Sequence, residues 1–186
     1  MKEDQDLLRD NATVKVLEWF SRNASKKIYV NELSRTVQLS NASCSRILKI
    51  LEVKGFLEKE EMGRAHYYRM KDNFATRETK RFFLILRLHE SGLIDHLASM
   101  HPSLTNLVLY GSCATGEFDE NSDIDILAIT NSRIKRDIEP FQEFLEKRIE
   151  ITSMNIGKWI SMKESNDGFY QEVKRDGILL FGGDLP

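Results

Sequence analysis

The sequence has only two cysteines, Cys44 and Cys113, no long apolar run and almost no net charge in its 186 residues. Two cysteines without metal-ligand spacing cannot form a disulfide framework, and they favour a reducing cytoplasm as the location. No stretch approaches the roughly 18 apolar residues of a membrane span, so we expect no membrane partner. The first ten residues are acidic and lack an apolar core, so no secretory signal is expected. Apolar residues make up 41% of the chain, which is enough for a globular core.

The net charge of −2 conceals opposite charges in the two halves of the chain. Residues 11–71 contain 12 Lys and Arg against 6 Asp and Glu, whereas residues 100–186 contain 9 against 15. A basic segment attracts polyanions, and an acidic segment binds nucleic acid only if cations or local basic groups offset its charge. Two modules with different partners are one interpretation. The other is that solvated faces of the two halves simply differ in charge.

Two helices joined by a short turn are predicted before Gly55. Asn31 is a candidate N-cap of the first helix, and residues 38–40 form the turn. Ser40 or Asn41 then caps the second helix. One face of the second helix is apolar and carries Cys44, Ile47, Leu48 and Leu51. Gly55 ends this helix.

A β-hairpin is predicted to follow. Residues 56–60 and 65–69 have the composition of strands, and the turn over 61–64 contains Gly63, which can adopt a positive φ. Apolar residues at helical spacing also predict a helix over 12–22. This order of helices and hairpin is the layout of a winged helix-turn-helix.

Residues 11–71 resemble the MarR- and ArsR-like winged-helix DNA-binding domains. The matching segments are 30–37, 39–51 and 54–57. The resemblance implies DNA as a partner and residues 41–51 as the recognition helix. The side chains expected to contact DNA are Asn41, Ser43, Ser45, Arg46, Lys49 and Arg64, the last at the tip of the wing. The alternative is a winged helix that makes only protein contacts, with an ordinary solvated helix face.

Residues 72–99 are expected to be helical and to connect two modules. Ser91-Gly92 is expected to divide this segment into two helices. Its apolar residues at helical spacing are Phe82, Leu86, Leu93 and Leu97. This face either packs as core or forms the seam of a homodimer, because winged-helix proteins commonly recognise paired half-sites.

A glycine-serine turn and a pair of carboxylates follow in the C-terminal half. Residues 104–110 are predicted to form an apolar strand that leads directly into Gly111 and Ser112. Glycine lets the backbone approach a phosphate closely, and helix N-terminal amides favour anions. Asp123 and Asp125 lie in the next predicted strand and point the same way, because strand side chains alternate faces. Two like charges on one face repel each other, but together they can bind divalent cations.

A third carboxylate, Glu150, lies in the strand predicted over 149–156, after a helix predicted over 141–148. Ile149 and Ile151 flank Glu150, so Glu150 faces away from them. If this strand pairs with the strand of the two aspartates, Glu150 lies near both.

Residues 100–183 resemble the minimal nucleotidyltransferases of the DNA polymerase β superfamily. The resemblance rests on Gly111, Ser112, Gly116, Ser122, Asp123, Asp125 and Glu150. Residues 170–181 also look like the terminal helix and edge strand of that family. Two positions depart from it: Thr115 stands where an arginine is common, and Glu150 where an aspartate is common.

The resemblance implies transfer of a nucleoside monophosphate, with AMP from ATP as the expected case, to an acceptor hydroxyl on a protein or small molecule. Two Mg²⁺ ions would be held by Asp123 and Asp125, with Glu150 as a further ligand or as proton acceptor. The residues expected to bind the nucleotide are Gly111, Ser112, Gly116 and Ser122.

We therefore expect an α+β chain in three parts. They are a winged helix over 1–71, a helical connector over 72–99, and a nucleotidyltransferase domain over 100–186 with a mixed β-sheet and helices packed against it. Two other functions remain open. The C-terminal domain could bind NTP as the sensor of a transcriptional regulator without turnover, or act as an antitoxin-like partner of a HEPN-type protein.

Overall fold

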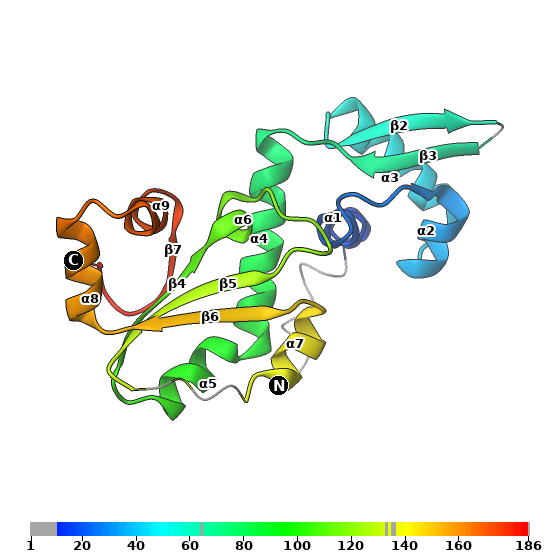
Figure 1. The fold of residues 1–186 in the computed structure, drawn as a ribbon. Coiled ribbons are helices and arrows are strands. Elements are labelled where there is room, and N and C mark those ends of the chain that lie inside the picture. Colours follow the sequence, from blue (N-terminus) through cyan, green and yellow to red (C-terminus); the bar gives the residue numbers. More distant parts are fainter. Residues whose placement is uncertain (1–10, 64, 133, 135–136, 186) are drawn as a thin grey trace. The chain divides into compact units, whose positions relative to one another are not determined.

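The computed structural model describes residues 11–63, 65–132, 134 and 137–185. The chain divides into two compact units, unit 1 over Met1–Phe83 and unit 2 over Leu84–Pro186 (Figure 1). The boundary falls inside one helix, α4 (Phe74–Ser91), so the segment 72–99 is divided between the two units. The fold is α+β, as predicted from the sequence.

Before α4, the described part of unit 1 contains three helices, a short strand and a hairpin. The elements are α1 (Ala12–Arg22), β1 (Ile28–Tyr29), α2 (Val30–Thr36), α3 (Asn41–Val53), β2 (Leu57–Met62) and β3 (Ala65–Met70). The strands form an antiparallel sheet in the order β1-β3-β2. Side chains from all three helices and the sheet share one core, which includes Phe20, Leu33, Leu48 and Leu57.

Capping explains where α3 begins, but the predicted cap of α2 is wrong. The Ser40 hydroxyl accepts a hydrogen bond from the backbone N of Ser43 at 3.1 Å, as a helix N-cap does. Asn31 instead lies inside α2, which begins at Val30. The cap position belongs to Tyr29, whose pairing with β3 fixes the chain direction at that point.

The hairpin turn is tighter than the sequence predicted. Met62 pairs with Ala65, so the strands extend into the segment 61–64 that was expected to form the turn. Gly63 has a φ of +64°, the left-handed conformation expected of it. Arg64, predicted to contact DNA from the wing tip, lies outside the described residues.

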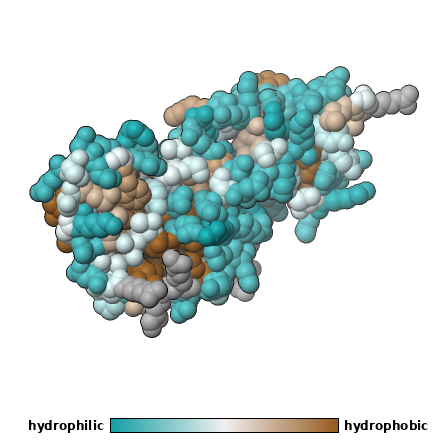
Figure 2. All heavy atoms as spheres, viewed as in Figure 1, coloured by the Kyte–Doolittle hydropathy of each residue, from teal (hydrophilic) through white to brown (hydrophobic). Residues whose placement is uncertain are grey.

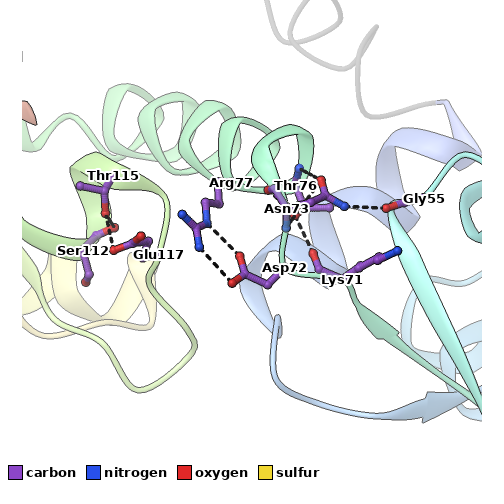
Figure 3. A network of polar contacts seen from close by, with 9 residues as sticks. All are labelled: Gly55, Lys71, Asp72, Asn73, Thr76, Arg77, Ser112, Thr115 and Glu117. Carbon is purple, nitrogen blue, oxygen red and sulfur yellow. Dashed lines mark hydrogen bonds and ion pairs between the residues drawn. The ribbon is translucent and has the colours of Figure 1, made fainter.

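Helix α4 begins with a reciprocal cap (Figure 3). The Asn73 side-chain oxygen accepts from the backbone N of Thr76 at 3.1 Å, and the Thr76 hydroxyl accepts from the backbone N of Asn73 at 3.0 Å. The Asn73 amide also donates to the carbonyl of Gly55 at 2.8 Å, which ties the start of α4 to the end of α3. Arg77 donates to the two carboxylate oxygens of Asp72 at 2.8 and 3.0 Å.

The predicted division of the helical segment at Ser91-Gly92 is confirmed. Gly92 has a φ of +74° and precedes α5 (Leu93–Met100). The predicted apolar face is partly wrong, because Phe82 is 53% exposed while Leu93 and Leu97 are buried. The apolar residues of α4 that are buried in its place are Phe83, Leu84 and Leu88. Leu84 and Leu88 lie one helical turn apart and join the core of unit 2, which sets the buried face.

The described part of unit 2 is built on a four-stranded mixed sheet in the order β6-β5-β4-β7. Its strands are β4 (Leu104–Tyr110), β5 (Ile124–Thr130), β6 (Ile149–Met154) and β7 (Ile178–Phe181). Strand β5 runs antiparallel to β4 and parallel to β6. Strand β7 pairs with β4 at the edge, as expected for the end of the chain.

Helices of unit 2 cover both faces of this sheet (Figure 1). They include α6 (Gly111–Thr115), α7 (Glu139–Leu145), α8 (Ile156–Glu164) and α9 (Gly168–Asp176). Ile124 and Ile126 of β5 pack with the leucines of α4 and α5, whereas Leu127 of β5 packs with Trp159 of α8 and Tyr170 of α9. Strand β5 is therefore buried on both faces.

Two element boundaries in unit 2 differ from the prediction. The strand expected over 149–156 ends at Met154, because Asn155 caps a helix, α8, that the sequence analysis missed; its side chain accepts from the backbone N of Lys158 at 2.8 Å. The helix expected over 141–148 ends at Leu145, because Glu146 adopts a φ of +55°.

None of the helices among the described residues is long and apolar enough to span a membrane. Hydrophilic residues predominate on the face of the molecule that Figure 2 shows. The most exposed large apolar side chains, Val53 and Phe74, lie on different helices.

Candidate active site

A sharp turn carries the chain from β4 into α6. Gly111 opens this turn with a φ of +68°, and Gly116 ends α6 with a φ of +78°. A Cβ atom built on Gly111 would lie 2.8 Å from Oδ2 of Asp125, so this carboxylate would have to shift to admit a side chain at that position. The positive φ and the neighbouring carboxylate thus both favour glycine at position 111.

Asp125 and Glu150 lie side by side on the same face of the sheet. They are register partners in the parallel pair of β5 and β6, and such partners share a face. Ile149 and Ile151, which flank Glu150, pack in the core on the opposite face, as predicted. Asp123 lies immediately before β5, two residues from Asp125.

The carboxyl group of Asp125 is in an unfavourable environment for its charge. Burial raises its pKa above the ordinary value, and the negative charges of Asp123, Glu150 and Glu172 raise it further. The influence of Asp123 and Glu150 places the three predicted acids in one electrostatic cluster. A carboxyl group whose pKa is shifted by burial together with specific charged neighbours is a candidate functional residue.

Glu172 is the acid that the sequence analysis did not find. It lies on α9, a helix that was expected, and its charge acts on Asp125 and on the hydroxyl of Tyr110. Its position depends on how α9 packs on the sheet, through Tyr170 and Val173. The amphipathic pattern of that helix was the only sequence signal that could have indicated which residues flank its buried face.

Tyr110 lies near the acids on this face and contacts Thr152 and Phe169. The Tyr110 and Thr152 hydroxyl oxygens lie 3.1 Å apart, and the ring of Phe169 meets the Tyr110 ring edge-on at a centroid distance of 5.1 Å. Tyr110 is the register partner of Asp125 on β4. Burial raises the pKa of the Tyr110 hydroxyl, so it remains protonated at neutral pH.

The acids of this site offer oxygen ligands of the kind that bind Mg²⁺. Within the described ranges, no three His, Cys, Asp or Glu side chains form a group that could hold a metal ion by themselves. Mg²⁺ in nucleotide-dependent enzymes is usually bound through one or two carboxylates together with substrate phosphates and water. Asp123 and Asp125 offer such oxygen ligands, and a cation would offset the repulsion that raises the Asp125 pKa. These residues therefore fit a Mg²⁺ ion whose ligands are completed by phosphate.

A hollow of about 380 Å³ opens beside the glycine-serine turn. Its walls are Gly111, Ser112 and Thr115 on one side and residues of α9, including Glu172 and Arg175, on the other. The Thr115 hydroxyl donates to the carbonyl of Ser112 at 3.2 Å and lies 3.4 Å from a carboxylate oxygen of Glu117 (Figure 3). A neutral side chain held within the turn thus occupies the place where the resembled family commonly has an arginine.

The hydroxyl of Ser122 is engaged within its own loop. It donates to the Asp119 carboxylate at 3.1 Å and accepts from the backbone N of Asp119 at 3.0 Å. The same carboxylate accepts from the backbone N of Asn121 at 2.9 Å. Ser122 therefore shapes the loop that leads into Asp123, and contact with a nucleotide remains a prediction for it.

Glu150 also borders a second hollow, of about 160 Å³, between β6 and α7. Arg148 lines it and forms an ion pair with Glu150. The third carboxylate therefore has a cationic partner in this structure.

The residues predicted to contact DNA lie on the solvent side of α3. Asn41, Arg46 and Lys49 are exposed, and Ser43 and Ser45 are half-buried. The wing, by contrast, balances its own charges through ion pairs. These pairs are Lys27 with Glu60, Lys59 with Glu61, and Arg69 with Glu58.

Residues 90–180 match the family model of the nucleotidyltransferase domain. The matched part is just under half of the chain's length. The match includes the glycine-serine turn and all three predicted acids. No curated protein matches the chain.

Solved structures resemble the chain at low identity. One is a proposed nucleotidyltransferase from Sulfolobus solfataricus, with 18% identity, a TM-score of 0.37, and coverage of 61% of this chain and 92% of that one. Another is a possible transcriptional regulator from Methanosarcina mazei Go1, with 17% identity, a TM-score of 0.35, and coverage of 44% and 72%. A third is a toxin–antitoxin with AMP-PNP, with 19% identity, a TM-score of 0.36, and coverage of 50% and 74%. Similarity at this level says nothing about substrate or partner.

Proposed function

We propose that unit 2 transfers a nucleoside monophosphate, AMP from ATP, to a hydroxyl group of a protein or small-molecule acceptor and releases pyrophosphate. The observation that carries this proposal is the Asp125 carboxylate, held against Gly111 and surrounded by the charges of Asp123 and Glu150. A structural role does not account for a partly buried carboxylate placed among like charges at the end of a buried strand.

Each residue has a distinct task in this proposal. Gly111 lets the backbone approach the β- and γ-phosphates, and the Ser112 hydroxyl donates to a phosphate oxygen. Asp123 and Asp125 hold Mg²⁺, which supplies positive charge to the leaving pyrophosphate and lowers the pKa of the acceptor hydroxyl. Glu150 receives the proton of that hydroxyl or adds a ligand on the acceptor side.

A second function, NTP binding without turnover, is favoured by one specific contact. Arg148 forms an ion pair with Glu150, and the Glu150 carboxylate would have to leave this partner to bind a metal ion or an acceptor hydroxyl. In that case the chain is a regulator, and nucleotide binding to unit 2 changes its affinity for DNA.

Unit 1 is proposed to bind DNA through α3 in either case. The support is the exposure of Arg46 and Lys49 on the helix face opposite the buried Cys44 and Leu48. Exposed cations on one helix face suit phosphate contacts and base edges in the major groove. Recognition of paired half-sites would require a homodimer.

The test is an incubation of the chain with Mg²⁺, ATP labelled at the α-phosphate, and a host lysate as the source of acceptor. We expect label on an acceptor with the wild type and none with the double variant Asp123→Ala, Asp125→Ala. Asp95→Ala, an exposed aspartate on α5 in the same unit, serves as the matched control and should transfer normally. A wild type that binds ATP and labels no acceptor would favour the sensor instead.

A further inference from the structure

Lys147 occupies an unusual place for a lysine. It follows α7, two residues before the start of β6, and its side chain is half-buried. Its ammonium group donates to the backbone carbonyls of Asp119 at 2.5 Å and Ser122 at 2.9 Å, and lies 5.3 Å from the centre of the Phe118 ring. A single side chain thus fixes two carbonyls more than twenty residues earlier in the chain.

Those carbonyls belong to the loop that leads into Asp123. The opposite side of the loop is held by Cys113, whose thiol donates to the Asp123 carbonyl at 3.1 Å. Immediately after Asp123, the backbone N of Ile124 donates to the carbonyl of Arg148 at 2.8 Å. Hydrogen bonds from Lys147, from Cys113 and to the carbonyl of Arg148 therefore hold the backbone around Asp123. Of these, only the bonds from Lys147 are made by a charged side chain.

We propose that Lys147 is the positioning residue of the acidic site, holding the 119–122 loop so that the Asp123 carboxylate lies beside Asp125. The proposal rests on the function proposed above. Removal of the ammonium would leave the carbonyls of Asp119 and Ser122 without these hydrogen bonds, which is costly for partly buried groups. The loop would then relax towards solvent and carry Asp123 away from its partner. Lys147 does not touch the reacting groups and acts through Asp123.

The charge of Lys147 contributes to the same effect. Burial lowers the pKa of its ammonium, while the nearby carboxylates of Asp119, Glu120 and Asp123 act in the opposite direction and favour the charged form. A positive charge near Asp123 reduces the repulsion between the two aspartates. A neutral side chain of similar length would lose both the hydrogen bonds and this charge.

The experiment compares Lys147→Met and Lys147→Arg with the wild type and with Lys158→Met, the same change at an exposed lysine on α8. Mn²⁺, a paramagnetic substitute for Mg²⁺, is titrated with ATP present to supply the phosphate ligands, and its binding is followed by electron paramagnetic resonance. We expect Lys147→Met to bind Mn²⁺ about 10-fold more weakly, as is usual for partners that orient a ligand, and Lys147→Arg to recover part of the loss. Lys158→Met should bind as the wild type does.

Amide hydrogen exchange gives a readout that requires neither metal nor activity. The backbone N–H groups of Asn121 and Ser122, both bonded to Asp119, should exchange faster in Lys147→Met, while those of β5 remain protected. If Lys147→Met does not fold, Lys147→Gln, which keeps one amide donor, gives the same comparison.

If folded Lys147→Met shows the Mn²⁺ affinity or the amide exchange rates of the wild type, the positioning role of Lys147 is overturned. The transferase proposal stands in that case, provided that the wild type is active. A wild type that binds Mn²⁺ no better than Asp125→Asn overturns both proposals.

Discussion

The carboxylate of Asp125 occupies the space where a side chain on Gly111 would begin. A Cβ atom at position 111 would lie 2.8 Å from Oδ2 of Asp125. The distance links the phosphate-binding turn of the proposed site directly to its central acid. Any change at position 111 is therefore felt by the carboxylate.

Gly111→Ala should reduce nucleotidyl transfer by about 100-fold, because a displacement of the order of 1 Å at reacting groups has that effect. The backbone strain of a positive φ, about 1–2 kcal/mol for alanine, adds a loss of stability. Gly157→Ala on α8, where a Cβ would make an ordinary contact, is the control. Steady-state kinetics with labelled ATP measure the effect, and equal rates for Gly111→Ala and the control would contradict it.

Asp125→Asn should raise the melting temperature of unit 2 by a few degrees at pH 7 without metal, while it abolishes transfer. The reason is that the folded chain raises the Asp125 pKa, so the charged form destabilises the fold above the ordinary aspartate pKa. The gain should disappear as the pH falls below the ordinary value, where the carboxyl is protonated in both states. Calorimetry from pH 3 to pH 8 measures this, and a variant less stable than the wild type at pH 7 would argue against the repulsion.

Binding of a divalent cation should weaken with acidification at a higher pH than is usual for aspartates. Protons compete with the cation for Asp125, and its pKa lies above the ordinary value because of burial and the neighbouring charges. As the pH falls, the affinity for the cation should therefore begin to fall near the raised pKa of Asp125. Isothermal titration with Mn²⁺ at several pH values provides the measurement; an affinity independent of pH down to the ordinary aspartate value would exclude Asp125 as a ligand.

Loss of the Asn73 cap of α4 should lower the free energy of unfolding of unit 1. Asn73→Ala removes the reciprocal bond with Thr76 and the bond to Gly55, and should cost about 1 kcal/mol, typical of a lost N-cap. Urea unfolding followed by the fluorescence of Trp19, in a Trp159→Phe background, isolates unit 1. Asn41→Ala, an exposed asparagine at the start of α3, is the control, and the same midpoint in both would show that the cap contributes nothing.

Arg46→Ala should weaken DNA binding and reduce the salt slope of log affinity by about 1 if Arg46 contacts a phosphate. Arg46→Lys keeps the charge and should keep that slope. Fluorescence anisotropy with duplex DNA at several salt concentrations separates the two variants. An affinity that does not vary with salt would contradict binding through phosphates.

Local signals in the sequence predict most of this fold. Ser40, Gly63 and Gly92 act within a few residues, as caps or turn residues, and the structure places them as expected. The wrong N-cap at Asn31 has a different cause. Pairing of Tyr29 with β3 starts α2 two residues earlier than expected, and that pairing is a contact between distant parts of the chain.

The residues of the candidate site likewise fall into those that local sequence signals predict and those that depend on contacts between distant parts of the chain. Strand alternation predicts that Asp125 and Glu150 face away from the isoleucines that flank Glu150, and the register of β5 with β6 brings them together. Glu172 and Lys147 could not be predicted, since each reaches the site through tertiary packing of α9 or through a loop–strand contact. No residue spacing along the chain encodes such contacts.

Strand β5 separates two apolar layers, with Ile126 in one and Leu127 in the other. A strand enclosed in this way opens to water only when the whole unit comes apart, so its amides should be among the slowest to exchange. Asp125 is part of that strand, and its backbone is therefore anchored as firmly as any in unit 2. In the proposed transferase, any motion that admits substrate or releases product is therefore expected outside β5, while the backbone that carries the central carboxylate stays in place.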